Sequence, residues 1–354
     1  MNEKLIAQFA ENAFASADYT GRIASLPQRA KNRPLHIAAF GGSVTYGYNS
    51  EGAGKDIIPY PALLCDLLPY ETELRNFAAS GTNAWFGLYL AVREIAAFSP
   101  DLVLLEYAVN QPAAKEYVSA YESLTAYLTA LPSAPALIHV MCVNESGNSS
   151  ENLLTHVAVH YAQPVICVRN AMQGIPWEEY AGDAVHPHAQ GQKMLAEAVF
   201  RVMQSRDADA VSYELPAPCL DRSARTLTIC GLLSGDGGLR ERIPFLHLLG
   251  GADAVILQAC ADSYTLEAES DAFLLVFRQS CFEDTDDAIL TVDDEPPLRL
   301  QANLLTGWGN PFVQRVIPKT KSASHRLTLR HTGGSGRFIL WGIAAYKIRK
   351  EDSI

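Results

Sequence analysis

The sequence predicts two domains: a doubly wound α/β domain with a mostly parallel five-stranded sheet, followed by an all-β sandwich. From Leu35 to about Arg206, short apolar runs alternate with longer stretches of helical periodicity, which is typical of strands that helices cover on both faces. Beyond about Val211 the helical periodicity fades and short strand-like segments follow one another between turns, as in antiparallel sandwiches. A length of 354 residues also suits two domains.

Five apolar runs are expected to form the parallel sheet. Each is shorter than a typical helix and lacks regular polar alternation, so each suits a strand buried on both faces. The intervening stretches, such as Ala84–Phe98 and Ala114–Leu131, have the pattern of helices, and a helix at Gln190–Met203 would complete the domain. The five runs are Leu35–Phe40, Leu74–Ala78, Leu102–Tyr107, Ala136–Val143 and Val165–Val168.

Eight further segments are expected to form a jelly-roll-like β-sandwich, because turn residues separate them at short intervals. We expect an N-terminal helical arm at 1–33, the α/β domain at 34–208 and the sandwich at 209–354, with Pro216 and Pro218 in the linker. The eight segments are Arg225–Cys230, Ala254–Ala259, Tyr264–Ala268, Ala272–Arg278, Ala288–Val292, Leu298–Leu304, His325–Arg330 and Arg337–Ile348.

Composition argues against several classes of partner. The 28 basic and 39 acidic residues leave a net charge of −11, so the chain should attract neither a nucleic-acid backbone nor anionic lipid. No window approaches the roughly 18 apolar residues that span a membrane. The N-terminus, which begins Met1–Lys4, lacks the long apolar core of a signal peptide. We therefore expect a cytoplasmic protein, with secretion of a trimmed form left open. Homo-oligomerisation is also left open.

Two motifs carry the groups of a serine hydrolase. In an open parallel sheet, ligands bind beyond the carboxyl ends of the strands. The segment Gly41–Gly47 follows the first apolar run, and its small residues permit a tight turn that exposes Ser43 Oγ. Asp183 and His186 are three residues apart ahead of the last helix, a spacing that lets the carboxylate orient the imidazole. Each motif alone is common by chance.

Two further places also follow predicted strands. In the segment Ser80–Asn83, Gly81 would let a substrate oxygen approach its backbone N–H, although a plain turn is the alternative. Asn110 stands after the third run, where its amide could donate to a developing oxyanion. An asparagine ahead of Pro112 is otherwise an ordinary loop former.

Taken in order, these motifs resemble the blocks of the SGNH (GDSL-like) hydrolase family. The Gly-Asp-Ser-Leu block is matched by Gly41–Gly47, with Gly42 in place of the usual Asp, as in the Gly-Gly-Ser branch. Gly81 matches the second block, and Ala108–Gln111 matches the third without its Gly and final Asp. The Asp-x-x-His-Pro block is complete at Asp183–Pro187. The resemblance covers the predicted α/β domain and implies a flavodoxin-like three-layer α/β/α fold.

The resemblance also implies a mechanism. Ser43 would attack an ester carbonyl, His186 would act as general base and then acid, and Asp183 would hold the tautomer of His186. The N–H groups of Ser43 and Gly81, together with the Asn110 amide, would bind the oxyanion. No metal or organic cofactor is implied.

The resemblance does not by itself identify the substrate. Tyr46, Asn83, Trp85 and Trp177 are candidates for contacting it, with simple packing as the alternative for the aromatic rings. The Gly-Gly-Ser block with an appended sandwich is similar to carbohydrate esterases, which implies a small or oligosaccharide ester substrate with an acetyl or other short acyl group. An acyltransferase, a lipase or thioesterase, and an inactive glycan-binding protein are the alternatives.

Overall fold

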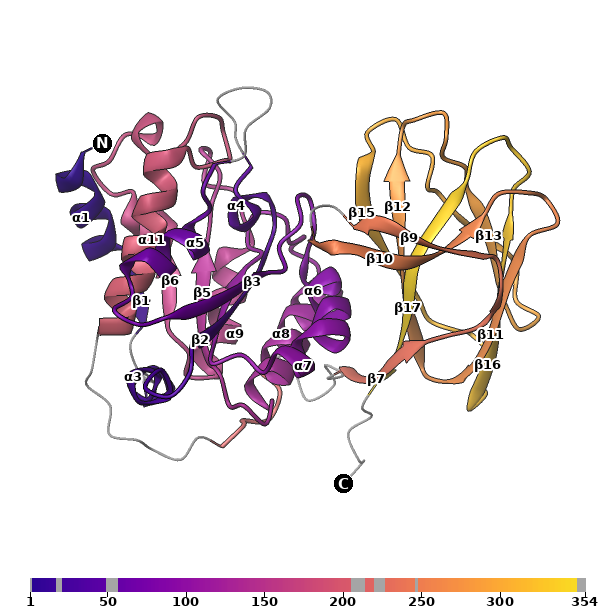
Figure 1. The fold of residues 1–354 in the computed structure, drawn as a ribbon, viewed down its shortest axis with the longest axis horizontal. Helices are drawn as coiled ribbons and strands as arrows, with labels where there is room; N and C mark the ends of the chain where they lie inside the picture. Colours follow the sequence, from indigo (N-terminus) through magenta and orange to yellow (C-terminus); the bar gives the residue numbers. More distant parts are fainter. Residues whose placement is uncertain are drawn as a thin grey trace. The chain divides into compact units, whose positions relative to one another are not determined.

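A computed structural model of the protein describes residues 2–16, 21–48, 57–204, 214–219, 227–245 and 248–348. The chain divides into two compact units, Met1–Ala224 and Arg225–Ile354. The first is a three-layer α/β/α unit and the second a β-sandwich (Figure 1), so the predicted fold class is confirmed. Within the described ranges, no helix has the length and apolar composition to cross a membrane.

The sheet of the first unit contains all five predicted strands. Its order is β1-β6-β5-β4-β2-β3, in which β1 alone runs antiparallel to its neighbour. The central strands are buried along their whole length, which explains why their sequences are apolar apart from Glu106 and His139. The strands are β1 Phe14–Ser16, β2 Leu35–Gly41, β3 Thr72–Asn76, β4 Leu102–Glu106, β5 Ala136–Met141 and β6 Val165–Cys167.

Helices cover both faces of this sheet (Figure 1). Helices α1 Glu3–Asn12, α5 Tyr60–Leu67 and α11 Ala189–Gln204 lie on one face, and α6 Ala84–Leu90, α8 Lys115–Thr129 and α9 Glu151–His160 lie on the other. Short helices complete the unit: α2 Gly21–Ala24, α3 Leu26–Arg29, α4 Ser43–Tyr46, α7 Ala96–Phe98, α10 Val168–Ala171, a π-helical turn at Ala91–Ile95 and a 3-10 turn at Trp177–Glu179.

The N-terminal segment is built into the core of the α/β unit. Ile6 and Phe9 of α1 are buried with side chains of α11 in one hydrophobic cluster. Phe9 also stacks on Tyr180, with ring centroids 5.6 Å apart. Strand β1 then adds a sixth, antiparallel strand beside β6. The sequence pattern predicted an arm of helices only, because three residues are too few for a recognisable strand period.

The predicted boundary at 208/209 lies outside the described residues. The linker expected around Pro216 is described at residues 214–219, and these residues contact the α/β unit. The N–H of Cys219 donates to Glu122 of α8, and His160 of α9 contacts the carbonyl oxygen of Ala217 at 2.6 Å.

The second unit consists of two antiparallel sheets around one hydrophobic core. One sheet has the order β15-β12-β17-β10-β9, with β7 also paired to β17, and the other has the order β14-β13-β16-β11-β8. The strands are β7 Leu227–Leu233, β8 Asp236–Gly237, β9 Leu239–Phe245, β10 Leu248–Leu257, β11 Ser263–Glu269, β12 Ala272–Ser280, β13 Ala288–Val292, β14 Leu298–Leu300, β15 Trp308–Val316, β16 Ser324–His331 and β17 Phe338–Ile348.

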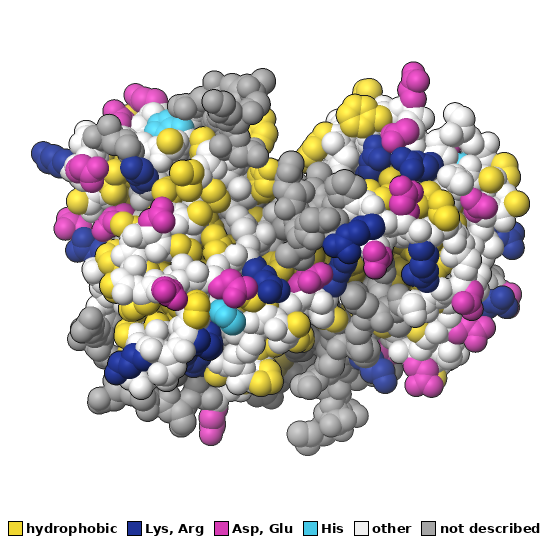
Figure 2. Space-filling model, viewed as in Figure 1, with side chains coloured by type: hydrophobic (Ala, Val, Ile, Leu, Met, Phe, Trp, Pro, Cys, Tyr) yellow, Lys and Arg dark blue, Asp and Glu magenta, His cyan; other side chains and the backbone are white. Residues whose placement is uncertain are grey.

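All eight predicted segments are strands, but the sequence analysis missed β8, β9 and β15. Strands β9 and β15 lie at the two edges of their sheet. Proline has no N–H to donate to a ladder. An edge strand pairs on one side only, so β15 accommodates Pro311. The edge position also explains the exposed polar residues at the start of β9, which obscure its apolar pattern. Figure 2 shows acidic and basic side chains interspersed over one face of each unit.

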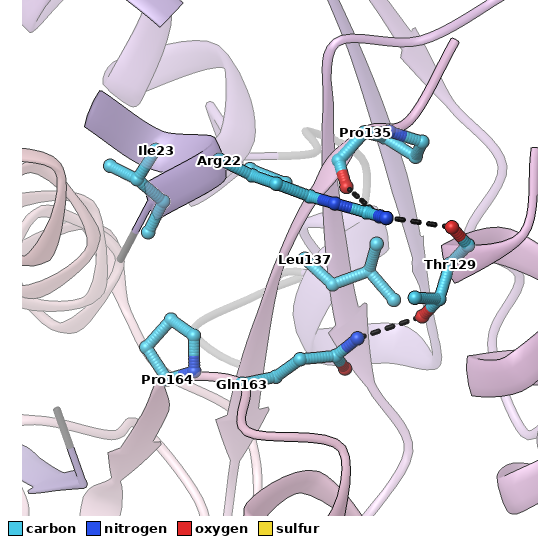
Figure 3. Close-up of a pocket in the computed structure, with 8 residues that line it drawn as sticks. Arg22, Ile23, Thr129, Pro135, Leu137, Gln163 and Pro164 are labelled. Atoms are coloured by element: carbon cyan, nitrogen blue, oxygen red, sulfur yellow. Dashed lines mark hydrogen bonds between the residues drawn. The ribbon is translucent and has the colours of Figure 1, made fainter. Parts of the chain in front are cut away.

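A buried histidine, His139, lies within β5 beside the amino end of β6. The ring of His139 lies 2.6 Å from Tyr121 Oη and 2.5 Å from Gln163 Oε1, and Gln163 donates in turn to Thr129 Oγ1 at 2.7 Å. Arg22 donates to the carbonyl oxygen of Thr129 beside a cavity of about 10 Å³ (Figure 3). That volume holds about one water, and it lies at the opposite end of the strands from Ser43.

Protonation of this histidine should destabilise the fold in acid, whereas the raised pKa of Glu106 acts in the opposite direction. Burial lowers the pKa of His139 from 6.5 to about 4, although its hydrogen bond to Gln163 raises it in part. The unfolded chain therefore takes up the proton first, and stability falls as the pH drops from 6.5 towards 4. We expect a loss of roughly 2 kcal/mol between pH 7 and pH 5 from this group.

Urea unfolding at both pH values measures this loss. His139→Asn should remove this loss, so that its free energy of unfolding rises relative to that of the parent as the pH falls from 7 to 5, whereas His156→Asn, at an exposed position of α9, should follow the parent. An equal slope in all three proteins would contradict the prediction.

Candidate active site

The candidate nucleophile lies on a turn that directly follows strand β2. The chain leaves β2 at Gly41 and enters the single-turn helix α4 at Ser43. A Cβ atom on Gly41 would lie 2.3 Å from Thr45 Oγ1 and 2.8 Å from the carbonyl oxygen of Glu106. No side chain fits there, so the glycine allows the tight turn. Ser43 is only 7% exposed.

The structure brings Ser43, His186 and Asp183 into one hydrogen-bonded chain. His186 Nε2 lies 2.9 Å from Ser43 Oγ, and His186 Nδ1 lies 2.8 Å from Asp183 Oδ2. Asp183 Oδ1 accepts the backbone N–H groups of Val185 and His186 at 2.7 and 2.6 Å. With Asp183 ionised, Nδ1–H donates to it and the free Nε2 can accept the serine proton.

The electrostatics keep Asp183 ionised. Burial raises the pKa of Asp183, but hydrogen bonds from the His186 ring and from the N–H groups of His186 and Val185 outweigh it. The net effect is a pKa below the ordinary value, so the carboxylate remains charged at neutral pH. A charged Asp183 can stabilise an imidazolium at His186.

Trp177 braces the loop that carries this pair. Its indole Nε1–H donates to the carbonyl oxygen of Asp183 at 2.8 Å, and its half-buried ring packs edge-on against Tyr180 at 5.3 Å. Gly182 N–H donates to the carbonyl oxygen of His186 at 3.1 Å, so the loop folds back on itself. Trp177 was predicted to contact substrate; in the structure its indole contacts Asp183 and Tyr180, and substrate contact stays a prediction.

The candidate oxyanion donors surround the same turn. Gly81 has a φ of +74°, and its loop lies against β2 because Ala79 N–H and Thr82 Oγ1 both donate to the carbonyl oxygen of Gly41. A Cβ atom on Gly42 would lie 2.1 Å from Asn110 Nδ2. The Asn110 amide therefore occupies the space that a side chain at 42 would need, next to Ser43.

The remaining predicted contact residues lie close to the site in sequence but have structural partners. Asn83 Oδ1 accepts the N–H of Trp85 and caps α6. Trp85 is 4% exposed, which favours the packing alternative, and substrate contact stays a prediction for this residue. Tyr46 is half-buried at the end of α4.

Sequence analysis missed two residues of the site. Tyr48 is 45% exposed, and its ring lies 4.6 Å from that of His186. The left-handed Gly47, with a φ of +94°, redirects the chain between Tyr46 and Tyr48, a signal that the sequence does contain. Glu106, at the end of β4, is buried beneath the nucleophile turn. It gave no sequence signal beyond being an acid in an apolar strand.

The described residues contain no group of three or more His, Cys, Asp or Glu side chains that could hold a metal ion. The groups that the structure brings together at the site are Ser43, His186 and Asp183, with N–H donors around them.

The Ser-His-Asp chain lies at the carboxyl edge of the parallel sheet in the α/β/α unit, and a β-sandwich follows this unit in the chain. No protein-family model matches the chain, and no curated protein matches it. Among solved structures, it is similar to a two-domain esterase (CEX) active on acetylated mannans, at 20% identity and a TM-score of 0.78 over 97% of this chain and 99% of that one.

The same esterase co-crystallised with mannopentaose matches with a TM-score of 0.79, at 20% identity over the same shares of both chains. An acetylxylan esterase, Axe2, from Geobacillus stearothermophilus covers 48% of this chain and 94% of its own, with 18% identity and a TM-score of 0.39. The likeness to the two-domain structures extends over both units of the chain. It confirms the predicted two-domain fold.

Proposed function

We propose that the protein is a serine esterase of the SGNH type that removes acetyl or other short acyl groups from carbohydrates. The observation that carries this proposal is the hydrogen-bonded chain from Ser43 through His186 to Asp183. Three residues separated by up to 143 positions meet there in the arrangement of a serine nucleophile, a histidine general base and a carboxylate that orients the histidine.

The geometry supports a two-step hydrolysis. Ser43 Oγ attacks the ester carbonyl carbon while His186 Nε2 takes its proton, and the Asp183 carboxylate stabilises the imidazolium. The carbonyl oxygen becomes an oxyanion that the N–H groups of Ser43 and Gly81 and the Asn110 amide bind. His186 then returns the proton to the departing alcohol oxygen. Water, activated by the same imidazole, cleaves the acyl-serine and releases the acid.

Two observations support a carbohydrate substrate. The two-domain esterase that matches nearly the whole chain is active on acetylated mannans. The exposed ring of Tyr48 beside His186 also offers an aromatic face of the kind that packs against the apolar face of a sugar ring.

The proposal is tested by measuring acetate release from acetylated manno- and xylo-oligosaccharides, beside p-nitrophenyl esters with acyl chains of two to twelve carbons. We expect release from the oligosaccharides and a preference for the acetyl ester, both lost in Ser43→Ala. Preference for long acyl chains would favour a lipase instead. Acyl transfer to added sugar that exceeds hydrolysis would favour an acyltransferase, and binding without turnover would favour an inactive glycan-binding protein.

A further inference from the structure

We propose that Glu106 is a positioning residue for the nucleophile. Its buried carboxyl group holds the Gly42 N–H and the Thr45 hydroxyl, and so keeps the turn around Ser43 in the geometry that the reaction needs. This inference rests on the proposed function, because it assigns Ser43 the role of nucleophile.

The contacts of Glu106 bracket Ser43 on both sides. Glu106 is the last residue of β4 and is 1% exposed. Its Oε2 accepts the N–H of Gly42 at 3.2 Å and the hydroxyl of Thr45 at 3.0 Å. These donors stand one residue before and two residues after Ser43. The carboxyl group therefore constrains the backbone that carries both the Ser43 hydroxyl and the Ser43 N–H.

The turn that Glu106 holds has little stability of its own. Helix α4 has four residues, and a single helical turn is unfavourable in isolation because nucleation fixes several dihedral angles for one hydrogen bond. Side chains from neighbouring elements also anchor it. Asn76 Nδ2 donates to the carbonyl oxygen of Thr45 at 2.8 Å, and Gln192 Nε2 donates to that of Val44 at 3.0 Å.

Glu106 differs from these other anchors in three ways. It is a potential anion, whereas Asn76 and Gln192 are neutral amides, and it accepts hydrogen bonds where they donate. It is also costly: burial raises its pKa to about 7, although hydrogen bonds from Thr45 and Gly42 lower it in part. No ion pair in the described part of the chain includes Glu106. A costly buried acid at this position is explained if holding the turn matters to the reaction.

The position of the Gly42 N–H gives the effect a direct route to catalysis. Fixing the Gly42 N–H fixes the orientation of the peptide before Gly42, and thereby limits the rotation of the next peptide, which ends in the Ser43 N–H. That N–H is one of the proposed oxyanion donors. A displacement of about 1 Å at such a group costs on the order of 10²-fold in rate.

The test compares Glu106→Ala and Glu106→Gln with the parent. Steady-state hydrolysis of p-nitrophenyl acetate measures kcat and KM, and hydrogen–deuterium exchange measures protection of the Gly42–Tyr46 backbone. Glu106→Ala should lower kcat by about 100-fold with KM changed less than about threefold, and should speed exchange in the turn. Glu106→Gln keeps a side-chain oxygen that can accept the same donors, so most of kcat should return.

Glu122→Ala is the matched control. Glu122 is also a buried acid, 3% exposed, and it accepts hydrogen bonds from Tyr161 and from Cys219 N–H far from Ser43 in sequence. This variant should lose stability while keeping kcat. If Glu106→Ala does not fold, Thr45→Val removes one of the two donors to Glu106 and should lower kcat by a smaller factor with KM retained.

The outcomes separate this inference from the proposed function. A parent without Ser43-dependent turnover would overturn the proposed function, and the exchange data would then decide the role of Glu106 alone. Unchanged exchange in the Gly42–Tyr46 segment of Glu106→Ala would overturn the positioning role, as would an unchanged kcat in an active parent. A rise in KM with kcat unchanged would assign Glu106 to substrate binding and overturn it as well.

Discussion

Ser43→Ala should reduce the kcat/KM for p-nitrophenyl acetate by roughly 10⁴–10⁶-fold. The substitution removes the oxygen that lies 2.9 Å from His186 Nε2 and leaves the rest of the site in place. The residual rate should come from the oxyanion donors and binding alone. Initial rates of nitrophenolate release, measured beside the unfolding midpoint of each protein, check the prediction.

The same experiment tests whether the three residues act as a unit. His186→Ala should cost about as much as Ser43→Ala, and the double variant should lose little more, because the second group has no function once the first is gone. Ser119→Ala, at a half-buried serine of α8, is the control and should keep the parent rate. Near-background rates in parent and Ser43→Ala alike would refute the esterase proposal.

Gly42→Ala should lower kcat by about 10²–10³-fold, comparable to the loss of one oxyanion donor. The backbone at Gly42 has φ −92° and ψ −148°, so no left-handed strain accompanies the change. The effect is steric, because the new Cβ would lie 2.1 Å from Asn110 Nδ2 and displace that amide.

A double-mutant cycle isolates that contact. Asn110→Ala removes the donor and should itself cost about 10²–10³-fold. Adding Gly42→Ala to Asn110→Ala should then cost little, because nothing remains to displace. Gly42→Ala losses of equal size in both backgrounds would show that Asn110 is not the group displaced.

The α/β unit could be predicted in such detail because its signals are local. A strand buried on both faces is expected to be mostly apolar, as β4 is up to its last residue, Glu106, and a helix that covers it must repeat every 3.6 residues. Strands without full burial lack that signal. Hence β15, an edge strand with Pro311, and β1, with three residues, did not stand out.

The sequence alone was sufficient to identify the order of elements, the sandwich, and the motifs with Ser43, Gly81, Asn110 and Asp183–His186, because each depends on residues that are neighbours in the chain. Side chains that meet through packing left no such pattern. The Tyr48 ring beside His186, the Asn110 amide against Gly42, and Glu106 beneath the nucleophile turn come from separate segments. Which of them touch depends on strand order and loop path, so only the folded chain reveals them.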